Sequence, residues 1–177
     1  MSAESGSDAE IGSDAAPGAT ELWYQDLVPG HRFDLGEIAV DGAEMRAFAE
    51  RFDPQWYHVD PVRAADGPFG GLIASGWFTA SLFMRAYVDG VLSRAAASAS
   101  PGVEELRWLA PVRAGDRLRG TLEVLDRTPS SSRPGVGTVT LLGTLRREPD
   151  GEPVLRCRFR GWFDLRPGLT AAPETSG

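Results

Sequence analysis

The stretch SGWFTASLFMRAYVDGVL, residues 75–92, decides the fold. Apolar side chains occur on nearly every side of this segment when it is wound as a helix. A helix that is apolar all round must be buried over most of its surface. The sequence therefore predicts one long central helix that begins near Ser75-Gly76 and runs to about Ala97.

The chain after this helix alternates between apolar and polar residues, as strands do. We expect strands over residues 103–112 and 116–126, and two more that begin at Val136 and Pro153. The apolar positions of the last three are Leu118, Leu122, Val124, Val139, Leu141, Leu145, Leu155, Cys157, Phe159 and Phe163. Period-two alternation is typical of a sheet with one covered face. The expected fold class is therefore α+β, a single antiparallel sheet wrapped around the long helix.

The segment before the central helix carries clear start and stop signals. Asp41 can cap a helix, with Glu44 three residues on as its capping-box partner. Pro54 restricts Asp53 to an extended conformation, so this helix ends there. We expect one further short turn of helix after Asp60-Pro61, and then a glycine-rich loop.

Composition excludes several classes of function. The net charge is −7, and no basic residue occurs in the first 20 positions, which argues against nucleic acid as a partner. No lysine is present, so Schiff-base chemistry on a lysine is excluded. The one cysteine, Cys157, alternates with apolar neighbours and is expected to be a buried small hydrophobe. No apolar run reaches the length of a membrane span and no secretory signal is visible, which favours the cytoplasm.

The densest cluster of chemically capable side chains is FDPQWYHVD, residues 52–60. Asp53 follows a helix C-terminus, whose partial negative charge is expected to raise its pKa. His58 could fold back beside it, although a histidine near aromatic residues is more often structural. A metal site from Asp53, His58 and Asp60 is disfavoured because no second histidine or cysteine lies nearby. His31 is expected to face solvent.

This cluster resembles the hydratase motif of MaoC-like dehydratases, in which an aspartate is followed by a histidine and a second aspartate. Asp53, His58 and Asp60 match it in type and spacing. Residues 67–83 resemble the family's loop and the beginning of its central helix, and residues 106–118 resemble its strand–turn–strand signature. The resemblance spans about residues 22–165 and implies the hot-dog fold, a sheet wrapped around one helix.

Five positions depart from the commonest family pattern. They are Gln55, Trp56, Tyr57, Ser75 and Met84, where asparagine, proline, isoleucine or leucine, histidine and serine are respectively usual. None of these changes removes the pair of Asp53 and His58. The bulky aromatic residues could pack the loop or line a pocket, so they bear on the choice of substrate.

The resemblance implies reversible hydration of a 2-enoyl thioester to an (R)-3-hydroxyacyl thioester, as in fatty-acid metabolism. Asp53 and His58 would hold the attacking water, and Gly76 would offer a backbone N–H to the thioester oxygen. The expected substrate contacts are Gln55, Trp56, Tyr57, Ser75 and Trp77. The segment 60–71 would border the acyl channel. Neither an organic cofactor nor a metal is implied, and the expected thioester is an acyl-CoA, with an acyl carrier protein as the alternative carrier.

Two other functions keep the same fold and stay open: a non-catalytic acyl-thioester binder or subunit, and a hot-dog thioesterase. Arginines would have to hold any coenzyme A phosphates, but the stripe of Arg156, Arg158 and Arg160 is interpreted as a solvated strand face. A lone sheet edge predicts a homodimer or larger homo-oligomer. The expected domain limits are a disordered acidic tail at 1–20, the hot-dog domain at 21–166 and a C-terminal tail at 167–177.

Overall fold

A computed structural model describes residues 20–168 of the chain. In chain order its elements are η1 (Tyr24–Asp26), β1 (Arg32–Ala39), α1 (Gly42–Phe52), α2 (Trp56–Val59), α3 (Pro61–Ala65), α4 (Gly76–Gly90), η2 (Leu92–Arg94), β2 (Ala97–Trp108), β3 (Arg117–Pro129), β4 (Val136–Glu148) and β5 (Pro153–Asp164). The expected tails fall almost wholly outside the described residues, so the domain limits stay a prediction.

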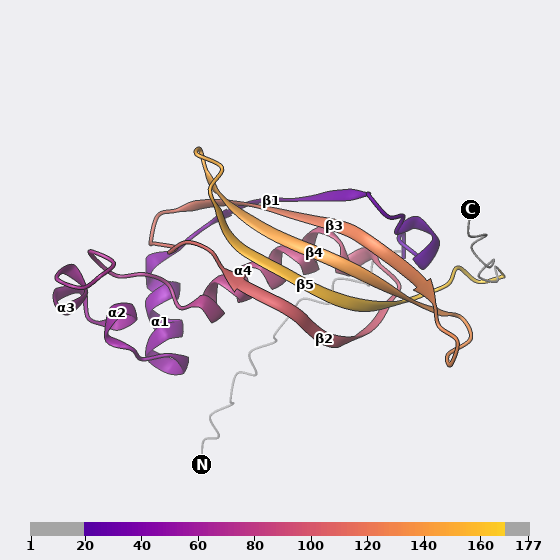
Figure 1. Cartoon of the computed structure of the whole chain (residues 1–177), viewed down its shortest axis with the longest axis horizontal. Helices are drawn as coiled ribbons and strands as arrows, with labels where there is room; N and C mark the ends of the chain where they lie inside the picture. The colour runs from indigo at the N-terminus through magenta and orange to yellow at the C-terminus, as the bar shows by residue number, and fades with distance from the viewer. Residues whose placement is uncertain (1–19, 169–177) are drawn as a thin grey trace, which may run out of the picture.

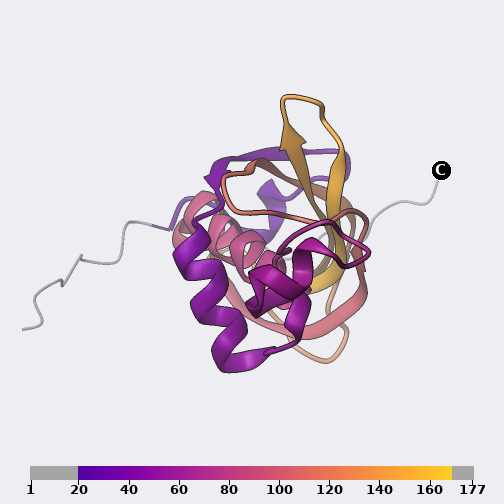
Figure 2. The ribbon, with the colours of Figure 1, turned by 90° about the vertical axis from the view of Figure 1, so that its left-hand side faces the viewer.

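The strands form one antiparallel sheet in the order β1-β3-β4-β5-β2. The sheet extends along α4 (Figure 1) and curves around it when the molecule is viewed from its end (Figure 2). All ten apolar strand residues expected to face the helix are buried, and seven of them have no exposed surface. The predicted fold class and the predicted covered face of the sheet are confirmed.

Helix α4 packs against the inner face of the sheet and approaches strand β4 very closely at one position. The ring of Phe83 occupies the place that a side chain at Gly143 of β4 would need. This explains a glycine in the middle of a strand, where the residue otherwise weakens the sheet. Two apolar side chains of α4 remain outside the core in this chain, since Trp77 is 60% exposed and Met84 is 47% exposed.

The predicted C-terminal end of the central helix is wrong. The helix ends at Gly90 and not near Ala97, which is the first residue of β2. Val91 leaves the helical conformation at φ −135° and is fully buried. The alanine-rich segment that follows favours helix by propensity, but its backbone pairs with β5 instead, and Asp164 donates its N–H to Ala96. Sheet hydrogen bonding therefore outweighs local propensity here.

The short helices α1, α2 and α3 cluster at one end of the molecule, beyond the sheet (Figure 1). Asp41 caps α1 through hydrogen bonds from the N–H groups of Ala43 and Glu44, each 2.8 Å long, as predicted. Helix α1 ends at Phe52, immediately before Asp53, which is also as predicted. The turn after Asp60 is α3, as predicted, whereas α2 was not predicted.

Several smaller expectations are also met. Cys157 is buried, and burial raises the pKa of its thiol. His31 is exposed and lies against Phe33. The exposed Arg158 and Arg160 of β5 both pair with Glu104 of β2, as suits a solvated strand face. Within residues 20–168, no helix is long and apolar enough to cross a membrane.

Candidate active site

Asp53 and His58 meet at the end of the molecule that carries the short helices. Asp53 is the residue after α1, and its N–H donates to Ala49. His58 lies in the single turn of α2, which returns the chain toward α1. The Nε2 atom of His58 is 3.4 Å from Oδ2 of Asp53. The structure therefore brings together the two residues that the motif singled out.

The imidazole of His58 is fixed from its other nitrogen. The ring is buried, and Nδ1 lies 2.8 Å from the carbonyl oxygen of Ile73. A carbonyl can only accept, so Nδ1 carries a proton and donates it. In the neutral ring Nε2 then presents its lone pair toward Asp53. Ile73 is itself held, because its N–H donates to the carbonyl of Tyr57.

The expectation that the pKa of Asp53 is raised is wrong. Burial does raise this pKa, but hydrogen bonds from Ser75 and Gln55 and the charge of a protonated His58 together lower it below the ordinary value of 3.8. The helix C-terminus argument considered only α1. Donors from two other segments surround the carboxylate, and hydrogen bonds to a carboxylate favour its charged form. Asp53 is therefore ionised at neutral pH and competent to accept a proton.

Ser75 lies behind the carboxylate. Its side chain has no exposed surface, and its hydroxyl donates to Asp53 Oδ2 at 2.7 Å. The same Oγ accepts the N–H of Trp77 at 3.3 Å and so caps α4. Sequence reasoning placed Ser75 among the substrate contacts. Its position suits the orientation of Asp53, because it offers no surface to a ligand.

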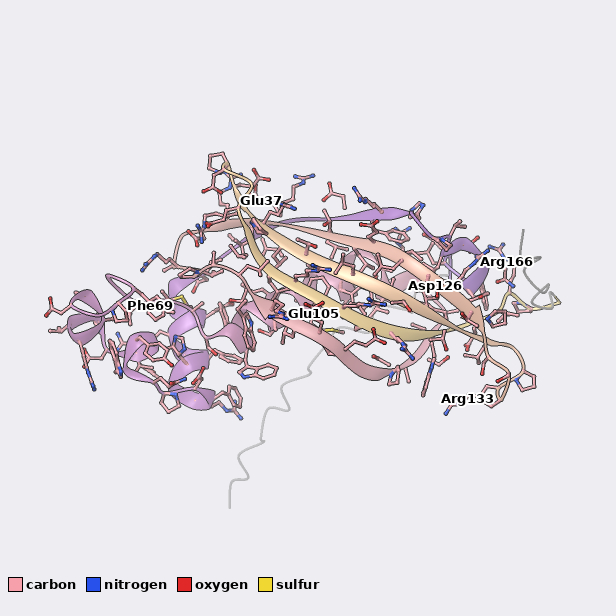
Figure 3. The ribbon with its side chains drawn as sticks, viewed as in Figure 1. Glu37, Phe69, Glu105, Asp126, Arg133 and Arg166 are labelled. Carbon is pink, nitrogen blue, oxygen red and sulfur yellow. The ribbon has the colours of Figure 1, made fainter. Side chains whose placement is uncertain are left out.

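A cavity of about 350 Å³ opens beside His58. Gly76, the first residue of α4, forms part of its wall together with Thr79 and Trp108. The N–H of Gly76, in the first turn of α4, has no acceptor within the helix, so it is available to an oxygen atom in the cavity. Phe69, from the segment expected to border the acyl channel, also lines the cavity and lies beside α3 (Figure 3).

Sequence reasoning missed Trp108, which was seen only as a strand residue. Its indole Nε1 donates to the carbonyl of Gly76 at 2.7 Å, and its ring packs over Gly76. A Cβ atom added at Gly76 would lie 2.5 Å from that ring. Close approach of Trp108 therefore already requires glycine here. The sequence does place Trp108 near the end of a strand, just before the Pro111-Val112 turn. Spacing alone could not show that its ring lies over the first residue of α4.

The remaining predicted contacts are distributed around the site. Gln55 donates to Asp53 Oδ1 at 2.7 Å, and the hydroxyl of Tyr57 donates to Gln55. Trp56 packs toward Gly67, away from the cavity beside His58. Trp77 lines a different, apolar cavity of about 450 Å³ between α4 and β2.

Asp60 caps α3 by accepting the N–H groups of Val62 and Arg63, as predicted. Its carboxylate is therefore engaged by the backbone of the following helix. Among the described residues, no group of three or more histidine, cysteine, aspartate or glutamate side chains could hold a metal ion. Within this part of the chain, the polar centre of the site consists of Asp53, His58 and the groups that hydrogen-bond to them.

An antiparallel sheet wrapped around one long helix, with a polar pair beside the N-terminus of that helix, defines a hot-dog protein. The model of the MaoC like domain matches residues 26–144, about two thirds of the chain. The chain belongs to the MaoC-like dehydratase family, and the predicted family is confirmed.

The chain is similar in sequence to several named proteins. The 3-hydroxyacyl-thioester dehydratase Z of Mycobacterium tuberculosis is 38% identical over 86 residues, which cover 48% of this chain and 57% of that protein. The protein YdeM of Bacillus subtilis is 31% identical over 112 residues, 63% of this chain and 79% of that protein. The match thus spans less than two thirds of the mycobacterial enzyme.

The solved structures give longer matches. The MaoC-like dehydratase from Rhodospirillum rubrum is 38% identical with a TM-score of 0.74, covering 83% of this chain and 99% of that one. The (R)-hydratase from A. caviae involved in PHA biosynthesis is 25% identical with a TM-score of 0.60, covering 80% and 99%. The family thus includes hydratases and dehydratases, which makes a hydro-lyase the kind of enzyme that the relatives support.

Proposed function

We propose that this protein is a hydro-lyase that reversibly hydrates 2-enoyl thioesters to (R)-3-hydroxyacyl thioesters. The observation that carries the proposal is the 3.4 Å separation between His58 Nε2 and Asp53 Oδ2. With Nδ1 engaged by Ile73, both atoms are acceptors in the neutral-histidine state. One water molecule can donate a hydrogen to each of them, and its own oxygen lone pair then remains free to attack carbon.

Hydration needs a base, an acid and a site for negative charge. Asp53 takes a proton from the water as the water oxygen bonds to C3, and the C2–C3 double bond becomes a single bond. The proton that leaves the water is the proton that C2 receives, with His58 assisting its delivery, so no other reactant is consumed. Charge that develops on the thioester oxygen is stabilised by the N–H of Gly76 and the dipole of α4.

The apolar cavity between α4 and β2 supports an acyl substrate. Its wall includes Met84, Leu92, Val103 and Phe159, and Trp77 also lines it. Trp77 packs edge-on against Trp108, with 5.4 Å between ring centroids, and Trp108 lines the cavity beside His58. An acyl chain placed here would begin near the reacting carbons and continue past the pair of tryptophans.

The alternatives share the fold and differ in the bond that changes. A thioesterase would hydrolyse the thioester, and a binding protein would change no bond. Gly76 and the two acceptors near it suit attack of water on carbon, which favours either enzyme over a binder. The (R)-hydratase and the dehydratase among the relatives favour hydration over hydrolysis.

A panel of straight-chain 2-enoyl-CoA esters tests this proposal. Loss of enoyl absorbance without release of thiol is the expected result, with an (R)-configured product on chiral analysis. Release of free thiol would replace the hydratase with a thioesterase. Tight binding with neither change would replace it with a binding protein. The same panel on an acyl carrier protein decides between the two carriers.

We further propose that the protein is a homodimer and acts in the cytoplasm. Strand β2 pairs only with β5 within the described residues, so its outer edge presents free backbone groups. Val103 on this strand is 58% exposed, and Trp108 at its end is 45% exposed. Pairing with β2 of a second copy would satisfy the backbone groups and cover both side chains.

A further inference from the structure

Three side chains of the segment after α1 form a directed chain of hydrogen bonds that ends on Asp53. The hydroxyl of Tyr57 donates to Oε1 of Gln55, and Nε2 of Gln55 donates to Oδ1 of Asp53 at 2.7 Å. The other carboxylate oxygen, Oδ2, receives Ser75 and faces His58. Each oxygen of Asp53 therefore has its own set of partners.

The direction of this chain follows from the chemistry of its ends. A carboxylate can only accept a hydrogen bond, so Gln55 must turn its NH₂ group toward Asp53. The amide oxygen then points the opposite way and needs a donor. Tyr57 supplies that donor, which makes the reversed amide, with its oxygen against the carboxylate, unfavourable. Without the phenol hydroxyl, nothing on the far side of Gln55 would distinguish its two orientations.

We propose that Tyr57 and Gln55 are positioning residues that hold Asp53 in one orientation and keep it ionised, so that Oδ2 stays beside His58. This inference rests on the proposed function, in which Asp53 accepts a proton from water. It changes the role expected from the sequence, where both residues were substrate contacts. We call the hydrogen-bonded chain from Tyr57 through Gln55 to Asp53 the relay. It needs a long amide at 55 and a phenol at 57, which gives a reason for two of the departures from the common family motif.

Several charged side chains on the neighbouring elements have partners of their own. On α1, the guanidinium of Arg51 lies over the ring of Phe52, and Glu50 pairs with Arg46. On α3, Asp60 caps the helix and Arg63 lies over Trp56. In the described part of the chain, His58 is the charged partner that faces Asp53. Burial raises the pKa of Asp53, and the hydrogen bonds from Ser75 and Gln55 lower it. The net lowering of this pKa is consistent with the relay.

The test is the titration of the Asp53 carboxyl carbon, followed by NMR in protein labelled with ¹³C-aspartate. Tyr57→Phe removes only the hydroxyl and is expected to raise the midpoint by roughly half a pH unit. Gln55→Leu removes the donor itself and should raise it further, by about one unit. Val62→Ala, at an exposed side chain of α3 outside the relay, is the control and should leave the midpoint unchanged.

The rate gives an independent readout. In Tyr57→Phe, kcat should fall while KM changes little, because Asp53 is held less firmly beside His58 and Tyr57 does not contact the substrate. An unchanged Asp53 midpoint in both Tyr57→Phe and Gln55→Leu would overturn the relay. If the wild-type protein hydrates no enoyl thioester, the proposed function fails, and the NMR midpoints still decide the relay.

Discussion

Ser75 Oγ donates a 2.7 Å hydrogen bond to Asp53 Oδ2 and accepts the N–H of Trp77, so one buried hydroxyl joins the carboxylate to the first turn of α4. The position of Asp53 is therefore linked to α4, the helix whose first residue is Gly76. A shift of α4 would move both the base and the backbone donor.

Removal of this hydroxyl should affect stability and titration together. Ser75→Ala loses the cap of α4, which costs roughly 1 kcal/mol of unfolding free energy. It also removes a donor from Asp53, so the pKa of Asp53 should rise. Denaturant unfolding and the NMR titration of the Asp53 carboxyl carbon measure the two effects. Ser93→Ala, at an exposed serine near the end of α4, is the control and should change neither. An unchanged midpoint of the Asp53 titration in Ser75→Ala would show that the contact does not tune Asp53.

Gly76 is more constrained than the sequence suggests. A methyl group there collides with Trp108, so Gly76→Ala should displace the indole and lose activity even if no substrate oxygen needs the space. The variant alone therefore cannot test the proposed backbone donor. Trp108→Ala removes the collision and supplies the background in which Gly76→Ala becomes informative.

In that Trp108→Ala background, Gly76→Ala should still lower kcat, by up to about 100-fold, because the methyl group holds the thioester oxygen away from the N–H. The comparison is the ratio of kcat for the double variant to kcat for Trp108→Ala. A ratio near one would mean that Gly76 serves only the packing of Trp108, and the oxyanion donor would have to be sought elsewhere.

The sequence predicted the elements better than it predicted their partners. Helix α4 and the inward faces of the strands followed from periodicity, since burial of those residues is what the pattern encodes. The end of α4 did not, because pairing of residues 97–108 with β5 is a long-range interaction. The proximity of Asp53 and His58 depended on α2, a single turn of four residues that is too short for periodicity to reveal.

The pKa of Asp53 shows the same limit. Local sequence placed it after a helix and suggested a raised value, whereas the donor that opposes this, Ser75, is 22 residues away in the chain. The role of Trp108 was hidden in the same way, because its partner Gly76 is 32 residues distant. Contacts between distant segments determine the electrostatics of this site, and a single sequence does not specify them.

The proposed dimer predicts that arginine substitutions at two exposed valines have different effects on dimer formation. Val103 lies on edge strand β2 and is 58% exposed, whereas Val62 lies on α3 and is 79% exposed. Val103→Arg should weaken the dimer, because it places a charge in an interface that excludes water. Val62→Arg should leave it intact. Light scattering at micromolar concentration measures both, and a monomeric wild-type protein would contradict the proposal outright.

Stability should depend on pH through Asp53. Its pKa is lower in the folded protein than the ordinary value of 3.8, so its contribution is fully present above that value and is lost as pH falls through the folded pKa. The free energy of unfolding of the wild type, relative to that of Asp53→Asn, should therefore decrease as pH falls below about 4. A difference constant over this range would contradict the lowered pKa.

The proposed function requires that Asp53 and His58 act on the same water, and the rate of enoyl absorbance loss measures this most directly. Asp53→Asn keeps the size of the side chain and His58→Ala removes its partner; each should lower kcat by roughly 100-fold or more with the fold intact. Asp60→Asn should lose far less, because Asp60 caps α3. Full hydratase activity in Asp53→Asn, or equal losses at Asp60 and Asp53, would contradict the assignment of this site.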